Sequence, residues 1–364
     1  MEMLWLHIKL LLREKLSFRL ACAYLMLLTI LVMVLPWLPI PYLPNELDLT
    51  HTYQAPFPWE SKQPDKAFHW LGTDGLGRDM LANILYGART AVFISIPVML
   101  AVAAIGTLLG AFAAFYGNKK LKLSFASLLV LLLAFAAFVY YGLYLPSVAM
   151  LTDKSISYTL VSISIAIVIV LLAIKLLLPL LMKVQLLQRK LSIPADRLLI
   201  RLIELFTSIP KLILILALAS FMAPSVYILI MLLIFTYWTG TARLARAETL
   251  KVKQLPFFEA AVALGVSDFK LVYRHVLPNM LAPLVVTFTF GVAGLMTLES
   301  TLSFLGIGIP GTLVSWGRTI AGIKSNTGAW WLVLLPGFFL ALTVLALQTF
   351  SHHVLTSTGK RKAS

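Results

Sequence analysis

Long apolar runs separated by shorter polar segments make up most of the chain. A helix needs about 20 mainly apolar residues to cross the hydrocarbon layer of a bilayer, which is roughly 30 Å thick. Backbone polar groups in lipid must be hydrogen-bonded within their own segment, so each long run is predicted to be a helix. The eight predicted spans cover residues 18–38, 91–116, 121–145, 156–182, 203–223, 225–242, 279–302 and 331–354.

The run at 203–223 differs from the others because it carries Glu204, Pro210 and Lys211. Glu204 and Lys211 are seven residues apart and would share one face of a continuous helix. Ionisable residues in membrane helices are functional candidates, which predicts a polar strip along a translocation path. In the alternative, which we favour, the helix begins later, so that Glu204 lies among the head groups and Lys211 snorkels towards them.

The longest polar segment, residues 39–90, is rich in proline at its start and ends in HWLGTDGLGRDMLANILYGART. Its glycines, Gly72, Gly75 and Gly77, permit tight turns. Apolar residues recur at helical spacing over residues 80–85, which predicts a short helix on the outer face of the membrane. A glycine-rich loop can also hold phosphate, but this one lacks the Walker spacing, so a structured loop is predicted instead.

A second polar segment, QLPFFEAAVALGVSDFKLVYRHVLPNMLAPL (residues 254–284), contains two short helical patterns. Gly265 is expected to end the first pattern in a left-handed conformation. Ser267 is a candidate N-cap of the second pattern, in which apolar residues recur at helical spacing over residues 269–276. Pro278 is expected to end it. From periodicity alone, the segment is either an amphipathic loop resting on lipid or a surface that a partner approaches closely.

Composition agrees with a membrane protein. Of the 364 residues, 60% are hydrophobic and 12% are charged, whereas a soluble domain has about half apolar and a quarter charged residues. The net charge is +15. With the N-terminus inside, 21 of the 30 Lys and Arg residues fall in inside segments and 7 in outside loops. This asymmetry predicts that both termini are cytoplasmic, and it explains the charge without nucleic acid.

The chain lacks the residue patterns of an enzyme. No G-x-x-x-x-G-K-[ST] occurs, so ATP is not expected to bind by the usual route. The six histidines show no metal-ligand spacing near carboxylates, and the single cysteine, Cys22, can form neither an internal disulfide nor a cysteine metal site. We therefore predict no catalytic residue, no metal and no cofactor bound by this chain.

Two features lie inside the predicted spans. Gly106 and Gly110 form a G-x-x-x-G pattern, which permits close helix packing. Glu299 lies near the outer end of its span, within LESTLSFLG. A carboxylate there is expected to fix an outer gate or loop rather than to bind solute.

The second polar segment carries a family resemblance. Glu259, Ala260, Ala261 and Gly265, followed by His275 and Pro278, resemble the EAA loop of ABC-importer permeases. In that family the loop forms coupling helices that dock into the ATP-binding subunit. The resemblance therefore implies that these six residues form the ATPase-coupling surface.

Three further stretches resemble the C-type subunits of dipeptide, oligopeptide and nickel permeases. They are LGTDGLGRDMLANILYGART, LESTLSFLGIGIP and SWGRTIAGIKSN, and the first contributes an external-loop motif of Gly72, Thr73, Asp74, Gly77, Arg78 and Asp79. The resemblance implies a type I ABC importer permease in the bacterial inner membrane. It also implies a second permease in a heterodimer, two ATP-binding subunits that hold ATP and Mg, an external substrate-binding protein, and a peptide or related small solute.

The chain also departs from that family. Members usually have six membrane helices, whereas residues 118–191 add two more spans, or in the alternative one re-entrant hairpin. An even number of spans preserves the orientation of everything downstream. The expected organisation is a cytoplasmic N-terminus and first membrane helix (1–38), an external loop (39–90), the start of the permease core (91–117), the inserted pair (118–191), the rest of the core (192–355) with the EAA loop at 255–279, and a basic cytoplasmic tail (356–364).

Two other functions are compatible with eight membrane helices. A secondary transporter driven by protons or sodium would need no partners, but Asp and Glu are nearly absent from the spans, where an ion relay would need them. The other function is that of a membrane scaffold, which recruits a cytoplasmic protein and transports nothing. ATP-dependent uptake by vesicles would separate these possibilities.

Overall fold

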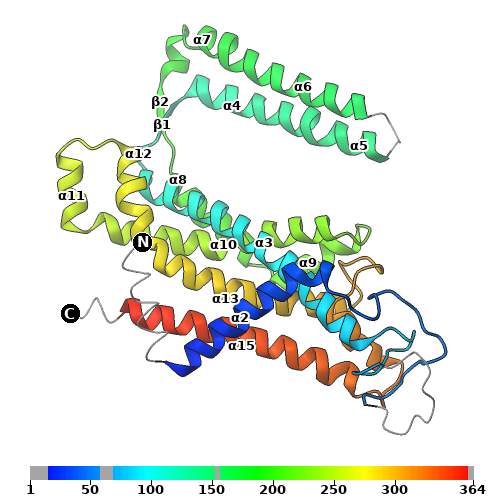
Figure 1. The fold of residues 1–364 in the computed structure, drawn as a ribbon. Helices are drawn as coiled ribbons and strands as arrows, with labels where there is room; N and C mark the ends of the chain where they lie inside the picture. Colours follow the sequence, from blue (N-terminus) through cyan, green and yellow to red (C-terminus); the bar gives the residue numbers. More distant parts are fainter. Residues whose placement is uncertain (1–14, 58–68, 152–155, 360–364) are drawn as a thin grey trace. The chain divides into compact units, whose positions relative to one another are not determined.

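The computed structural model describes residues 15–57, 69–151 and 156–359 and is mostly helical (Figure 1). The basic residues before Lys15 and the tail after Gly359 lie outside this part of the chain. Two compact units are present, one formed by Met1–Phe115 with Arg201–Ser364 and the other by Tyr116–Ile200. The predicted fold class, an all-α membrane protein, is confirmed.

The described residues contain seven helices long and apolar enough to cross a membrane, or eight if one bent pair counts as a span. The sequence predicted about eight. The helices of the first unit, with the two that continue into the second, are α2 (Leu16–Val34), α3 (Met80–Tyr116), α8 (Ala195–Thr207), α9 (Lys211–Ser220), α10 (Val226–Lys253), α11 (Pro256–Ala263), α12 (Asp268–Lys270), α13 (Leu277–Phe304), α14 (Trp316–Ala321) and α15 (Trp331–Gly359).

Helix α13 packs along α15, and α15 packs along α2 (Figure 1). Helix α3 packs against α10 through its glycines. An added Cβ at Gly106 would lie 2.7 Å from the Cβ of Thr241, and one at Gly110 would lie 2.3 Å from the carbonyl oxygen of Ala242. Lipid provides no hydrophobic drive for helices to associate, so such close backbone approach is a main source of their attraction. The packing predicted from G-x-x-x-G is confirmed.

The sequence predicted one helix over residues 203–223, and this is wrong. Two helices, α8 and α9, meet at a bend of 73°. Pro210 directly precedes α9 and has no N–H to continue a helix from α8. Glu204 and Lys211 therefore lie on different helices and do not share a face, and Lys211 is the first residue of the later one.

The predicted boundary at the start of the second span is also wrong. The sequence separated a short surface helix at residues 80–85 from a span at 91–116, whereas α3 is one helix of 37 residues. The polar residues between them, including Arg89 and Thr90, interrupt the apolar pattern. They do not interrupt the helix, and the hydroxyl of Thr90 donates to the carbonyl of Tyr86 one turn earlier.

The second unit is a helical hairpin with a short ribbon at its base. Strand β1 (Lys122–Ser124) pairs antiparallel with β2 (Lys190–Ser192). Its two spans, Phe125–Gly142 and Ser157–Leu181, are each long and apolar enough to cross a bilayer alone. Their elements are α4 (Phe125–Ala137), a π-helical turn (Phe138–Tyr144), α5 (Leu145–Leu151), α6 (Ile156–Leu172), a second π-helical turn (Ala173–Leu177) and α7 (Leu178–Leu181).

Candidate functional site

The EAA loop, residues 255–279, begins where three helices meet. Lys253, in the last turn of α10, donates from Nζ to the carbonyl oxygens of Ala114 and Phe115, both at 3.1 Å. These carbonyls belong to the last turn of α3, where a cation is favoured by the helix dipole. The buried ring of Phe258 in α11 packs edge-on against Phe115, with ring centroids 6.4 Å apart. The base of the EAA loop is therefore attached to α3 as well as to α10.

Gly265 ends α11 in the left-handed conformation predicted from the sequence, with φ of 74°. Its N–H donates to the carbonyl of Val262 at 3.0 Å, and the N–H of Val266 donates to that of Ala261 at 3.1 Å. An added Cβ would meet nothing within 4 Å. Glycine is therefore required by the backbone conformation and not by crowding.

Pro278 does not end the second helix of the loop, and that prediction is wrong. One continuous helix runs from Asp268 to Phe304, through α12, a π-helical turn (Leu271–Val276) and α13. A proline ring clashes with the carbonyl four residues earlier in an α-helix. The π-helical turn bonds one residue further back, as from the N–H of Leu277 to the carbonyl of Val272, and this wider turn accommodates the ring.

The six residues that carry the family resemblance do not all face the same way. Glu259 and Ala260 are exposed, whereas Ala261 is only 7% exposed and packs within the chain. The ring of His275 lies 5.9 Å from that of Phe257, so it connects the π-helical turn with α11. His275 thus links the two helices of the loop, Ala261 is buried, and Glu259 and Ala260 are open to a partner.

Sequence reasoning missed the most exposed apolar side chains of this loop. Leu264, Phe269 and Tyr273 are 84%, 79% and 67% exposed, and the rings of Phe269 and Tyr273 stack with centroids 6.1 Å apart. The helical spacing placed Phe269 and Tyr273 in one apolar pattern with Val276 and did not separate the exposed side chains from the buried one. The signal for Leu264 was a leucine directly before the glycine that ends a helix. Three such side chains exposed within residues 264–273 of one loop indicate an interaction site.

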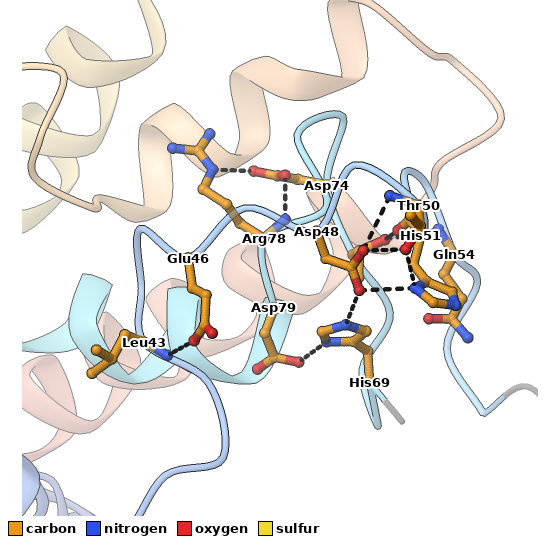
Figure 2. Close-up of polar contacts among 11 residues, drawn as sticks. Leu43, Glu46, Asp48, Thr50, His51, Gln54, His69, Asp74, Arg78 and Asp79 are labelled. Carbon is orange, nitrogen blue, oxygen red and sulfur yellow. Dashed lines mark hydrogen bonds and ion pairs between the residues drawn. The ribbon is translucent and has the colours of Figure 1, made fainter. Parts of the chain in front are cut away.

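The segment Gly72–Asp79, here called the GTDGLGRD loop, folds around a buried carboxylate (Figure 2). Asp74 accepts from the backbone N–H groups of Leu76 and Arg78, each at 2.9 Å, and from Arg78 Nε at 2.8 Å. Gly72 and Gly77 have φ of 80° and 72°. Trp331 of α15 donates from Nε1 to the carbonyl of Thr73 at 2.9 Å. The motif residues thus build a rigid loop attached to α15.

Beside this loop two imidazoles alternate with two carboxylates (Figure 2). The buried ring of His69 lies between Asp79, 2.9 Å from Nδ1, and Asp48, 3.8 Å from Nε2. Asp48 also contacts His51 at 2.8 Å. The Thr50 hydroxyl, which donates to Asp48, holds the pKa of that carboxyl at about 2, below its usual range. No group of three or more metal-ligating side chains was found among the described residues.

Replacing Asp79 with Asn is expected to lower the free energy of unfolding by about 1–3 kcal/mol. Asp79 is buried and accepts from the N–H of Ala82 at 2.8 Å, in the first turn of α3, as well as contacting His69. An amide offers one acceptor in place of two. Thermal unfolding in mild detergent measures the effect. Glu46→Gln is the control, because Glu46 is exposed and accepts one backbone N–H; equal melting temperatures for the two variants would contradict the prediction.

The remaining predicted residues occupy separate places. Glu204 is exposed and pairs with Arg201 at 2.8 Å. Glu299 is buried in α13 and accepts from the hydroxyl of Ser303 at 2.8 Å. Nearby, Arg318 donates to the carbonyls of residues 309, 310 and 313, each at 2.9 Å, and so orders the segment that follows α13. Lys211 lies against α10.

A family model described as the inner membrane component of binding-protein-dependent transport systems matches residues 175–357, about half of the chain. The chain belongs to this family. It is 26% identical to a Brucella suis protein provisionally named a peptide transport system permease protein, over 91% of this chain and 83% of the relative. It is 25% identical to the dipeptide transport system permease protein DppC of Bacillus subtilis, over 79% of this chain and 68% of the relative.

This inner membrane component is thus a multi-pass permease subunit of an ABC importer, as its resemblance to the EAA-loop permeases predicted. Such a subunit provides a path for solute and is not an enzyme. It works with a partner permease, an ATPase and a binding protein.

Proposed function

We propose that this permease pairs with a second, different permease to form the path by which peptides or a related small solute cross the inner membrane. Two separate ATP-binding subunits hold ATP and Mg and drive the cycle, and this chain binds no cofactor. The names of the relatives support a peptide cargo. The observation that carries the coupling role is the exposure of Leu264, Phe269 and Tyr273 in the same loop as the exposed Glu259 and Ala260.

The structure suggests how ATP-driven motion of the EAA loop would reach the membrane helices. An ATPase that moves α11 displaces Phe258, whose ring packs on Phe115 of α3. Lys253 connects the same turn of α3 to α10. Because α3 and α10 are in backbone contact at Gly110, they would move together, and this rocking would open the path alternately to each side.

The proposed orientation places both termini and the EAA loop in the cytoplasm, following the distribution of Lys and Arg. The GTDGLGRD loop then faces the outside, where the substrate-binding protein delivers its cargo. Glu299 lies near the same end of the membrane and, together with Arg318, holds the outer loop after α13. In this arrangement the ATPase and the binding protein act on opposite ends of α3.

The double variant Leu264→Glu, Phe269→Glu is expected to lose the ATPase during gentle affinity purification. Both side chains are exposed, so the two charges leave the fold intact but place carboxylates in an apolar contact, where unpaired charge is costly. Mass spectrometry with stoichiometry measures the ATPase that co-purifies.

The matched control is Leu47→Glu, an exposed leucine of the other polar segment. It is expected to retain the ATPase in full. A double variant that binds the ATPase as well as the unmodified chain does would contradict the proposed contact. The proposed function would be contradicted if the unmodified chain purifies alone and vesicles that contain it take up solute in response to an ion gradient.

A further inference from the structure

A lysine lies beside the break between α8 and α9. Nζ of Lys211 lies 4.3 Å from the ring centroid of Tyr237 in α10. Tyr237 is eleven residues from the start of α10 at Val226, which corresponds to about 17 Å along a helix. The hydrocarbon layer is roughly 30 Å thick, so if α10 enters it at Val226 this ammonium group lies well inside it, contrary to the snorkelling favoured from the sequence.

A second cation lies close by. Arg243 is six residues after Tyr237, about 9 Å further along α10. No ion pair to a carboxylate is recorded for either side chain within residues 15–57, 69–151 and 156–359. Two like charges, one inside the hydrocarbon layer and one near its edge, are costly without an anion, and such residues mark ion or substrate pathways.

The surface between the two cations is open. Gly240 lies between Tyr237 and Arg243 on α10, and a Cβ added there would meet nothing within 4 Å. Arg243 and Ala247 are exposed on the same strip of the helix. The positive end of the α9 dipole, which begins at Lys211, adds to the local positive potential. The site therefore has both space and charge for an anionic group.

We propose that Lys211 and Arg243 form a binding site for the carboxylate of the translocated solute, which is the C-terminal carboxylate when the solute is a peptide. This inference rests on the proposed peptide-transport function. Every unmodified peptide carries this group whatever its side chains, so one such site would serve many sequences. The arginine fork matches a planar carboxylate, and the lysine on its aromatic ring supplies a point charge that tolerates several directions of approach.

The test compares trialanine with trialanine amide, which differ in this carboxylate. The complex purified with its partners is reconstituted into vesicles without a membrane potential. ATP-dependent uptake is measured at peptide concentrations that saturate the binding protein with either peptide. The unmodified complex is expected to transport the acid about tenfold faster than the amide, as for the loss of one charged hydrogen bond. Lys211→Met and Arg243→Met are each expected to lower the uptake rate of trialanine towards that of trialanine amide.

Lys324→Met is the matched control. Nζ of Lys324 also lies over an aromatic ring, 4.1 Å from the ring centroid of Phe304, but Lys324 itself is outside the membrane spans. This variant should retain the preference for the acid. Retention of that preference by Lys211→Met would overturn the anion site alone. Loss of the second permease from the purified Lys211→Met complex would show that the cations pair with a partner carboxylate, and would also overturn it. Absence of ATP-dependent uptake of either peptide by the unmodified complex would overturn the proposed function as well.

Discussion

Replacing Gly110 with valine is expected to prevent α3 and α10 from packing, and so to remove most of the folded protein from the membrane. The added Cβ would lie 2.3 Å from the carbonyl oxygen of Ala242 and 3.0 Å from the Cβ of Ala245. Neither atom can rotate away, so the helices themselves must separate. Overpacking of a well-filled core costs about 1–3 kcal/mol, and a conflict with backbone belongs at the upper end of that range or above it.

Fluorescence-detected size exclusion in mild detergent measures this effect as the yield of monodisperse protein, and its melting temperature gives the stability. Gly337→Val is the control, since Gly337 also lies inside a helix but a Cβ there would meet nothing within 4 Å. A Gly110 variant with the yield and melting temperature of the Gly337 variant would show that the close approach of α3 and α10 is dispensable.

The membrane spans were predictable because hydrocarbon thickness dictates their length. The near-absence of charged residues from the apolar runs also made the spans easy to recognise. The contact between α3 and α10 was foreseen as well, because glycines four residues apart leave a flat surface on a helix. The spacing could not predict which helix packs against these glycines. That depends on the three-dimensional fold, which brings Ala242 against Gly110, 132 positions earlier in the chain.

Helix breaks were less predictable, and the prolines show why. Pro97, Pro283 and Pro336 lie inside continuous helices, whereas Pro210 lies at the break between α8 and α9. A membrane helix tolerates proline where neighbouring groups satisfy the freed carbonyl. That depends on surrounding helices and not on local sequence. The same reasoning explains Pro278, which a π-helical turn accommodates.

The candidate site was predictable in its location but not in its contact surface. The EAA residues and the conformation of Gly265 followed from the sequence. The exposed group did not, because Leu264 and Phe269 lie on either side of the turn at Gly265, and the π-helical turn after Lys270 then shifts the helical face. Leu271 and Val276, five residues apart, are therefore buried, and Phe269 and Tyr273 point outwards. A pattern with a period of 3.6 residues cannot reveal this shift.

Replacing Gly265 with valine is expected to reduce ATP-driven uptake more than tenfold while leaving membrane insertion intact. An L-residue in the left-handed region costs about 1–2 kcal/mol, and a β-branched side chain is a genuine outlier there. The turn between α11 and α12 would relax to a different angle. Leu264 and Phe269, on either side of Gly265, would then no longer present one surface to the ATPase.

The comparison that decides the role of Gly265 uses a second glycine with the same backbone. Gly306 has φ of 78° and, like Gly265, meets nothing within 4 Å of an added Cβ, so Gly306→Val introduces equal strain away from the EAA loop. It should lower stability by a similar amount and leave the ATPase stoichiometry unchanged. Gly265→Asn should retain much of the uptake, because asparagine tolerates this conformation. Normal uptake by Gly265→Val, or equal loss in both valine variants, would show that the turn is a structural element and not the point where ATP-driven motion enters the membrane helices.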